Sequence, residues 1–515
     1  MARLKSFFLN ISGGYFQISC NVAYSLLSVP LILHYLPTRH LGLWATIGQV
    51  TTYLSLVDLG MTAAFARLLI DQKGSDSRER YHALVSTSFW VSAVQGLMIA
   101  SLGWWLAPIG AALLKIPQAE ADLFVWLFRF QVLVLGFGFL FRPLHAILYA
   151  HQMEYVSSLA SGITLVGSLV FLAGFFALDC GPHALSYASL TGPLFTPLVL
   201  ISLGKKAGIW REISLFSKGS WQVFREIYAY GKEIFYMGLG HHLILTSQTM
   251  IVSRSLGLES AAAWAVGTKM FNLVLPLTWR PYGAAIPGMS EMLVQGDRAR
   301  LQQRLAGMIS LTFGLAVFFS GFMVLCNTPF VHFWTRGKIE WVGSGNYLLG
   351  LWLLVLALQT THCNFVSVTK QVGALKYLYF LEGAVFILVS LWLAPRFGFP
   401  GIILVSVICT LLFSYQYSLK NTGRFFGLPT ATMGWLPIVP GLGYLLIYVF
   451  FIFIFNYLTF SWSAELRLFG SVPVAFFLGG FLFYRFGIPG PLREELWQRL
   501  MSLPFAKRST RSSKG

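Results

Sequence analysis

The chain has 515 residues, of which 56% are hydrophobic and only 11% are charged, and its mean hydropathy is +0.67. Soluble domains carry about twice that share of charged residues, so the composition excludes a soluble enzyme. The formal net charge is +18, an excess that is typical of nucleic-acid-binding proteins but also of the cytoplasmic loops of membrane proteins.

Apolar stretches long enough to cross a bilayer, about 17 to 25 residues each, recur along the whole chain. We predict an all-α integral membrane protein with about fourteen transmembrane helices. These cover residues 13–36, 43–70, 83–107, 123–149, 156–178, 185–203, 234–254, 261–290, 305–328, 347–367, 377–395, 399–419, 435–459 and 466–486. If the N-terminus is cytoplasmic, most Lys and Arg residues fall in the inner loops, as the positive-inside rule requires. Both termini are then cytoplasmic, and the net charge gives no reason to expect nucleic acid.

The chain repeats itself at an offset of about 220 residues. Trp44 and Ala45 align with Trp264 and Ala265, and a charged turn follows in each half. Transporters built from such parallel repeats carry their substrate between the two halves. The predicted segments are a six-helix bundle at 1–204, a basic amphipathic linker at 205–233, a second six-helix bundle at 234–419, two additional transmembrane helices at 420–486 and a basic cytoplasmic tail at 487–515. The alternative for 205–233 is a disordered linker.

Four spans carry polar side chains at helical spacing. They are Gln17, Asn21, Ser25 and Ser28 in the first span, Thr51, Ser55, Asp58 and Thr62 in the second, His242, Thr246, Thr249 and Ser253 in the seventh, and Lys269, Asn272, Pro276 and Arg280 in the eighth. Polar residues within lipid are costly and normally face the protein interior or a water-filled cavity. Because these spans are equivalent under the repeat, we predict that they line one cavity. The alternative is that Ser and Thr serve ordinary helix contacts.

Five cations lie within spans or at span ends, namely Arg67, Arg129, Arg254, Lys269 and Arg280. Asp58 is the clear acid in the middle of a span, and Glu382 is a weaker case. A cavity with surplus positive charge attracts an anion, and guanidinium groups suit phosphate oxygens. The predicted substrate-binding residues are Lys269, Arg280, Arg254, Arg67, Asn272, Gln17 and Asn21, and the predicted ion-coupling residues are Asp58 and His242.

Several of these polar residues also have a structural interpretation. Arg67 can extend to the inner headgroups, and Arg254 can be an outer-loop charge. Arg129 and Arg142 can pair with lipid or with Glu154. The five Cys are scattered without metal-ligand spacing, and no P-loop is present, so we expect no metal, no cofactor and no catalytic residue.

The first two spans contain a recognisable pattern. Pro30-Leu31-Ile32-Leu33-His34-Tyr35-Leu36, then Leu41-Gly42-Leu43-Trp44-Ala45, then Tyr53-Leu54-Ser55-Leu56-Val57-Asp58-Leu59-Gly60-Met61 resemble the N-terminal signature of polysaccharide flippases. These O-antigen-type, Wzx-like proteins belong to the multidrug/oligosaccharidyl-lipid/polysaccharide (MOP) superfamily. The charged turns after the second and eighth spans are similar to that family as well.

The resemblance implies a two-bundle transporter that flips undecaprenyl-pyrophosphate-linked oligosaccharide units across the bacterial cytoplasmic membrane by alternating access. Central cations would meet the pyrophosphate while the prenyl tail stays in lipid. Expected partners are this lipid-linked substrate, membrane lipids, and the polysaccharide polymerase and chain-length machinery. One alternative is an ion-coupled multidrug or cation antiporter of the same superfamily. The other is a membrane glycosyltransferase or ligase, for which the loops are too short to form a catalytic domain and which would have to use a small periplasmic site at His332, Glu340 or Asp179.

Overall fold

The structure is a computed structural model that describes residues 2–72, 78–206, 208–212, 219–369, 373–490 and 493–494. This part of the chain forms helices and no strands, which confirms the prediction of an all-α protein. Ten of its helices are long and apolar enough to cross a membrane, or eleven if one bent pair counts as a single span. Each of the fourteen predicted intervals overlaps helical segments. The chain divides into two compact units, residues 1–265 and 266–515.

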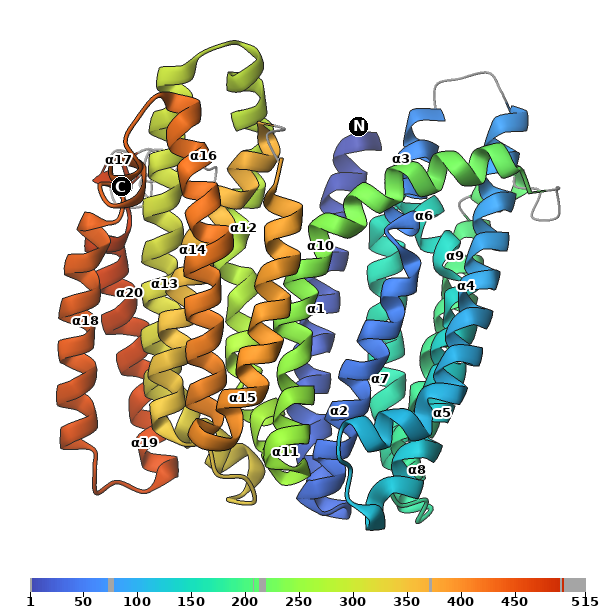
Figure 1. The fold of residues 1–515 in the computed structure, drawn as a ribbon, viewed down its shortest axis with the longest axis horizontal. Helices are drawn as coiled ribbons and strands as arrows, with labels where there is room; N and C mark the ends of the chain where they lie inside the picture. Colours follow the sequence, from blue (N-terminus) through green and yellow to red (C-terminus); the bar gives the residue numbers. More distant parts are fainter. Residues whose placement is uncertain are drawn as a thin grey trace, which may run out of the picture. The chain divides into compact units, whose positions relative to one another are not determined.

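Unit 1 is a bundle in which α1 packs against α7, α4 against the next helix α5, and α7 against α9 (Figure 1). Its elements are α1 (Ala2–Tyr35), α2 (Thr38–Leu54), η1 (Ser55–Asp58), α3 (Met61–Gln72), α4 (Arg78–Leu113), α5 (Gln118–Phe139), α6 (Arg142–Ala150), α7 (Glu154–Ala177), α8 (His183–Ser189), α9 (Thr191–Lys206), η2 (Ile209–Glu212), α10 (Trp221–Leu256) and most of α11 (Leu258–Gly267).

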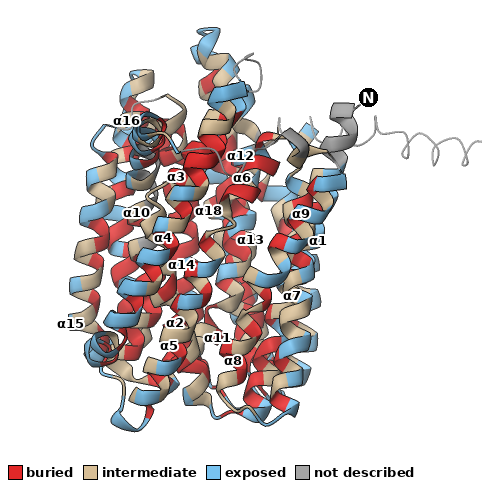
Figure 2. Cartoon of the chain, turned by 90° about the vertical axis from the view of Figure 1, so that its right-hand side faces the viewer, coloured by how far each residue is buried: buried red, intermediate tan, exposed pale blue. Residues whose placement is uncertain are grey.

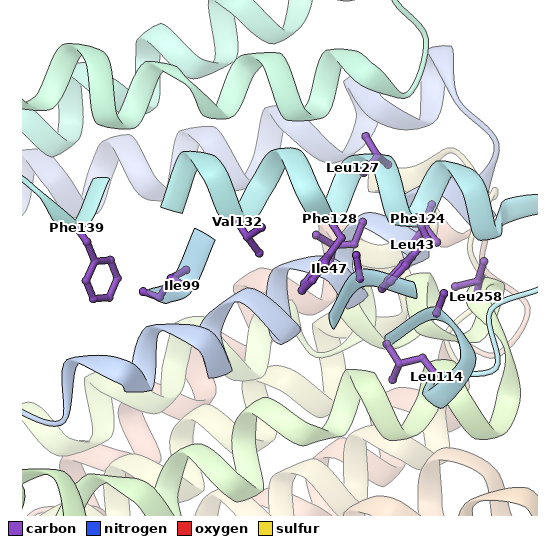
Figure 3. Packing of buried hydrophobic residues seen from close by; sticks show 12 residues of the cluster. Leu43, Ile47, Ile99, Leu114, Phe124, Leu127, Phe128, Val132, Phe139 and Leu258 are labelled. Atoms are coloured by element: carbon purple, nitrogen blue, oxygen red, sulfur yellow. The ribbon is translucent and has the colours of Figure 1, made fainter. Parts of the chain in front are cut away.

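A hydrophobic cluster joins α2, α4 and α5 in unit 1 (Figure 3). Leu43 and Ile47, one helical turn apart on α2, are fully buried there. Phe124 and Phe128 stack on each other along α5, with ring centroids 5.7 Å apart. A Cβ atom on Gly96 would lie only 2.3 Å from the carbonyl oxygen of Gly136. The small residues therefore bring α4 and α5 into backbone contact, as is usual between helices in membranes.

The second predicted span is broken, so the prediction of one continuous helix over 43–70 is wrong. α2 ends at Leu54, a 3₁₀ turn follows, and α3 begins at Met61 with a bend of 42° between the two helices. Leu59 and Gly60 adopt the left-handed conformation, with φ values of 49° and 73°. A Cβ atom on Gly60 would lie 2.4 Å from the carbonyl oxygen of Gly231, so glycine is required by its φ value and by its neighbour on α10.

The second half of the predicted linker is helical and continuous with the seventh span, because α10 runs from Trp221 to Leu256. Ser220 caps this helix by accepting a hydrogen bond from the backbone N–H of Val223. Val223 and Ile227 are buried, while Trp221 is exposed, so this part of α10 is amphipathic. α10 passes the end of α3 and then runs beside α2 (Figure 1). Residues 213–218 of the linker and 495–515 of the tail lie outside the described residues.

Unit 2 is built around α13 and α14. Its elements are α12 (Lys269–Val294), α13 (Arg298–Thr335), α14 (Gly343–Val368), α15 (Leu375–Thr410), η3 (Leu411–Tyr415), α16 (Gln416–Phe426), α17 (Thr430–Gly434), α18 (Val439–Leu458), α19 (Ala464–Pro473), η4 (Val474–Leu478), α20 (Gly479–Leu482) and η5 (Phe483–Gly487). In the most apolar window of α14, 83% of residues are buried, against 22% in α18, so α14 is central and α18 peripheral within the unit. Figure 2 colours the helices by the burial of their residues. α15 contains the predicted span 377–395 and the start of the predicted span 399–419, which are separated at Gly398 by non-helical backbone.

The repeat of about 220 residues recurs in the helix boundaries. α2 begins at Thr38 and α11 at Leu258, while the preceding helices end at Tyr35 and Leu256. The break within the second span has no counterpart at the equivalent position of the second half. There the helices α11 and α12 are separated earlier in the repeat, at Thr268. Contacts group α10 with unit 1, whereas the sequence repeat places it at the start of the second half. The boundaries at 204, 233, 419 and 486 between the predicted segments therefore stay a prediction.

Candidate functional site

In unit 2, α12 has one polar face and one packed face. Lys269 is half-buried, and Asn272 and Arg280 are exposed, three and eleven positions further along the same helix. The opposite face is buried, and Phe271 on it stacks on Trp352 with ring centroids 4.9 Å apart. The helix runs without interruption from Lys269 to Val294, so the predicted polar stripe lies on one continuous helix. This face presents two cations and an amide away from the core of the unit.

The turn that precedes Lys269 is held by close packing and by a buried side chain. A Cβ atom on Gly267 would lie 1.9 Å from the ring of Trp341, so only glycine fits there. The side-chain nitrogen of Asn327 donates a hydrogen bond to the carbonyl oxygen of Gly267 at 2.8 Å. Asn327 is fully buried. The backbone at the start of α12 is therefore fixed on both sides, two residues before Lys269.

Asn327 is itself oriented by a second buried amide. Its side-chain nitrogen also donates to Oδ1 of Asn346 at 2.8 Å, and the indole N–H of Trp341 donates to the same oxygen at 2.7 Å. Nδ2 of Asn346 in turn donates to the hydroxyl of Thr328 at 2.8 Å. This network joins α13, α14 and the turn before α12, so its loss would free the position of Lys269. Sequence reasoning missed it, although single Asn residues within apolar spans were a signal.

Lys269 has the electrostatic character of an anion-binding group. No ion pair in the described part of the chain involves it. A half-buried ammonium without a carboxylate partner attracts an anionic ligand more strongly than an exposed and solvated one. With Arg280 on the same face, α12 offers two cations that could contact one extended anion.

In unit 1, Asp58 lies at the break between α2 and α3 and has two kinds of partner. Its Oδ1 is 3.3 Å from a guanidinium nitrogen of Arg142, and it also accepts a hydrogen bond from the Thr62 hydroxyl. Arg142 stacks over the ring of Phe139 at 3.7 Å. The alternative that Arg142 pairs with Glu154 is therefore wrong. The carboxylate also accepts a hydrogen bond from the backbone N–H of Thr62. Because Thr62 lies in the first turn of α3, the negative charge of Asp58 stabilises the start of this helix.

Gln95 stabilises the broken helix from α4. Its side-chain nitrogen donates to the carbonyl oxygens of Val57 and Asp58 at 2.9 and 3.2 Å, and the side chain is buried. These carbonyl groups have lost their helical partners because of the break, and within lipid they need another donor. The predicted stripe on the second span does not share one helical face, since Thr51, Asp58 and Thr62 lie on three different elements.

The other predicted cations of unit 1 have local partners. Arg67 forms an ion pair with Asp71 on the same helix at 3.5 Å, with more than half of each side chain exposed. Arg254 donates a hydrogen bond to the carbonyl oxygen of Leu113 at the end of α4. Arg129 stacks over Trp104 at 4.7 Å. These contacts favour the structural interpretation of each cation, and a role in substrate binding stays a prediction.

The remaining predicted residues of unit 1 lie on α1 and α10. Gln17 is half-buried and Asn21 is exposed on α1, whereas Ser25 and Ser28 of the same stripe are buried. The side chain of His242 lies outside the described residues. On α10 the rest of that stripe, Thr246, Thr249 and Ser253, is buried, as helix-contact residues would be.

Glu382 is a buried acid in unit 2 that sequence reasoning ranked below Asp58. The side chain is 1% exposed, and one carboxylate oxygen accepts the backbone N–H of Ser414 at 3.2 Å in the π-helical segment η3. Tyr379 lies near this acid, and its hydroxyl accepts a hydrogen bond from the side-chain nitrogen of Gln359 at 2.8 Å. No ion pair within the described residues includes Glu382, in contrast to Asp58.

The sequence matches the model of a family described as polysaccharide biosynthesis protein over residues 41–335, which is more than half of the chain. The chain belongs to this family. The matched region includes the broken second span and the whole of α12. This confirms the resemblance found in the first two spans. No match was found among the curated proteins.

Solved structures with similar folds are MOP-superfamily transporters. An inward-facing multidrug-resistance MATE-family transporter has a TM-score of 0.67 and 14% identity, with 78% of this chain and 94% of that chain covered. The lipid II flippase MurJ in an inward closed conformation has a TM-score of 0.57 and 12% identity, with coverages of 94% and 98%. A MOP-superfamily transporter from Pyrococcus furiosus has a TM-score of 0.57 and 12% identity, with coverages of 83% and 96%. At these identities the likeness establishes the fold, and this polysaccharide biosynthesis protein is a multi-pass membrane protein.

Proposed function

We propose that this polysaccharide biosynthesis protein flips undecaprenyl-pyrophosphate-linked oligosaccharide units, such as an O-antigen or exopolysaccharide repeat, across the bacterial cytoplasmic membrane. The observation that carries the proposal is the polar face of α12, on which Lys269 and Arg280 point away from the core of their unit. A pyrophosphate is a doubly charged, extended anion whose oxygens suit an ammonium and a guanidinium at separate points. Family membership and the transporter fold support the same substrate class.

In the proposed mechanism these cations hold the pyrophosphate by charge, Asn272 hydrogen-bonds to it or to the first sugar, and the prenyl tail stays in lipid. Flipping needs no bond to be made or broken, so the protein acts as a transporter. Gln17, Asn21, Arg67 and Arg254 are proposed as further substrate contacts. Both termini are proposed to be cytoplasmic, and the polymerase and chain-length machinery are proposed to receive the flipped product.

An ion gradient is the proposed driving force, with Asp58 and His242 as coupling groups. The ion pair with Arg142 makes Asp58 a weaker candidate for ion coupling, because its carboxylate charge is already balanced by a fixed cation. We therefore add Glu382 to the proposed coupling groups. It is buried, hydrogen-bonded to the π-helical segment, and in no ion pair within the described residues. A buried carboxyl in such surroundings can exchange a proton as its environment changes.

The proposal is tested in cells that depend on this protein for surface glycan. Lys269→Ala and Arg280→Ala should each leave the protein in the membrane, lower surface polymer, and cause lipid-linked repeat units to accumulate inside. Arg396→Ala is the matched control, because Arg396 is an exposed cation that stacks over Trp392 at 4.3 Å, in a predicted outer loop. Normal surface polymer in the double variant would contradict the proposal. Cationic-dye efflux that depends on Asp58 and not on Lys269 would instead support an antiporter.

A further inference from the structure

A cavity of about 450 Å³ lies in unit 2, apart from the polar face of α12. One wall is the first three turns of α13, and the other sides come from the chain between α17 and α18, from Pro440 in the first turn of α18 and from Pro489 after η5. The lining residues that matter for a ligand are Arg300, Gln303, Arg304, Gly307, Met308, Leu436 and Pro440. This volume is within the range of roughly 300 to 1,000 Å³ that is usual for small-molecule sites.

The lining changes character along α13. Arg300 and Arg304 are one helical turn apart and lie at one end, with Gln303 between them. Towards the other end the walls are mostly apolar, with Met308 on α13 and Leu436 and Pro440 opposite. The stretch from residue 300 to residue 310 is about 15 Å long at the helical rise. A ligand that fits has an anionic group at one end and an apolar portion at the other.

The deep end of the cavity is closed by close helix contacts. A Cβ atom on Gly441 would lie 2.6 Å from the ring of Phe313, and a Cβ atom on Gly314 would lie 2.6 Å from the carbonyl oxygen of Gly487. These contacts join α13 to α18 and to the last helix one turn beyond Ser310. At Gly307, by contrast, an added Cβ would meet nothing within 4 Å. The glycine therefore opens space inside the cavity.

The charged end is the end expected at the cytoplasmic surface. The positive-inside pattern places the start of α13 there, next to the anionic lipids of the inner leaflet. A further cation, Arg493, follows Pro489; its backbone N–H donates to the carbonyl oxygen of Pro489 at 2.8 Å, and its guanidinium donates to the carbonyl oxygen of Arg485 at 3.1 Å. The acid at this helix end, Asp297, is engaged as the cap of α13, since its Oδ1 accepts the backbone N–H of Arg300 at 3.1 Å.

We propose that this cavity binds one anionic phospholipid of the cytoplasmic leaflet. Its phosphate lies between Arg300 and Arg304, and its glycerol and first acyl carbons lie against Met308, Leu436 and Pro440. Guanidinium groups suit phosphate oxygens, and a basic pocket between helices at this membrane depth is a usual site for acidic headgroups. The bound lipid would join the two C-terminal helices to α13. This inference does not depend on the substrate proposed above.

The test measures how much phosphatidylglycerol the purified full-length protein retains after detergent washing, by native mass spectrometry, with phosphatidylcholine as the zwitterionic comparison. The wild type should retain phosphatidylglycerol selectively. Arg300→Gln with Arg304→Gln should lower retention by about tenfold, as expected for loss of charge-assisted contacts. Arg298→Gln is the matched control, because it removes the same charge at the same helix end outside the cavity lining, and it should change retention less than about twofold.

Gly307→Leu is a second variant that keeps both arginines and fills the open space, so it should also lower retention without unfolding the protein. Equal retention in the wild type and both cavity variants would overturn the proposal. So would equal retention of phosphatidylcholine and phosphatidylglycerol. Release of phosphatidylglycerol by millimolar inorganic phosphate would contradict a lipid site as well, because it would show that the free anion suffices.

Discussion

The buried amide network next to α12 gives a sharp prediction through Asn327→Leu. Leucine has the same branched arrangement of heavy atoms as asparagine but cannot donate hydrogen bonds to the Gly267 carbonyl and to Asn346, which are both 2.8 Å away in the structure. A hydrogen bond between membrane helices contributes about 0.6 to 1.7 kcal/mol, so losing both should cost about 1 to 3 kcal/mol of unfolding free energy. The turn before Lys269 should then lose its fixed position.

Transport should fall by more than the stability loss explains. If the displaced Lys269 loses one charged hydrogen bond to the pyrophosphate, about 1.5 kcal/mol, the substrate should bind about tenfold more weakly. Reversible unfolding measures the first effect. Flipping of a lipid-linked oligosaccharide in proteoliposomes, normalised to folded protein, measures the second.

The matched control is Ser320→Ala on the same helix. Ser320 is buried and donates to the Gly350 carbonyl at 3.0 Å, so its loss should cost a similar energy per hydrogen bond. It does not contact the turn at Gly267, and transport per folded molecule should stay near the wild-type rate. If Asn327→Leu and Ser320→Ala show the same transport per folded molecule, the network does not position Lys269 and the reasoning fails.

Three further predictions concern the broken span and the buried acid. Asp58→Asn and Arg142→Gln should each lower the free energy of unfolding by about 1 to 3 kcal/mol, which is less than for a fully buried pair because the Arg142 side chain is 31% exposed. In thermal unfolding, the double variant should lose less stability than the sum of the two single losses. Additive losses would exclude a coupled pair. Gly60→Ala should lower the free energy of unfolding by about 2 kcal/mol or more. Gly48→Ala is the control, because an added Cβ there meets nothing, and it should cause no loss of stability. Equal thermal-unfolding midpoints in the two variants would refute this. Glu382→Gln should keep the fold but remove the pH dependence of transport, and an unchanged pH profile would argue against a coupling role.

Hydropathy was sufficient to predict the helical architecture, because apolar runs of membrane length have few other solutions in lipid. It could not predict the break at residues 55–60. Leu59 is in the left-handed conformation there, which leucine rarely adopts, and the packing against Gly231 that holds the break comes from a helix about 170 residues later. Local sequence contains no information on such a contact.

The candidate site was predicted unevenly for the same reason. The polar face of α12 could be found because its residues repeat along one continuous helix. The pair of Asp58 and Arg142 could not be found, since periodicity says which residues share a face but not which helices meet. Asn327 and Asn346 were visible as isolated polar residues in apolar spans, but their common target, the backbone before Lys269, became evident only from the packing.

The central claim is that the cations of α12 recognise the pyrophosphate during flipping. The most direct measurement is the flipping rate of an undecaprenyl-pyrophosphate-linked oligosaccharide in proteoliposomes that contain the Lys269→Ala/Arg280→Ala variant, beside Lys269→Arg/Arg280→Lys, which retains both charges. We expect the alanine variant to lose at least about tenfold in rate and the charge-retaining variant to lose much less. An alanine variant that flips this lipid at the wild-type rate would contradict the account.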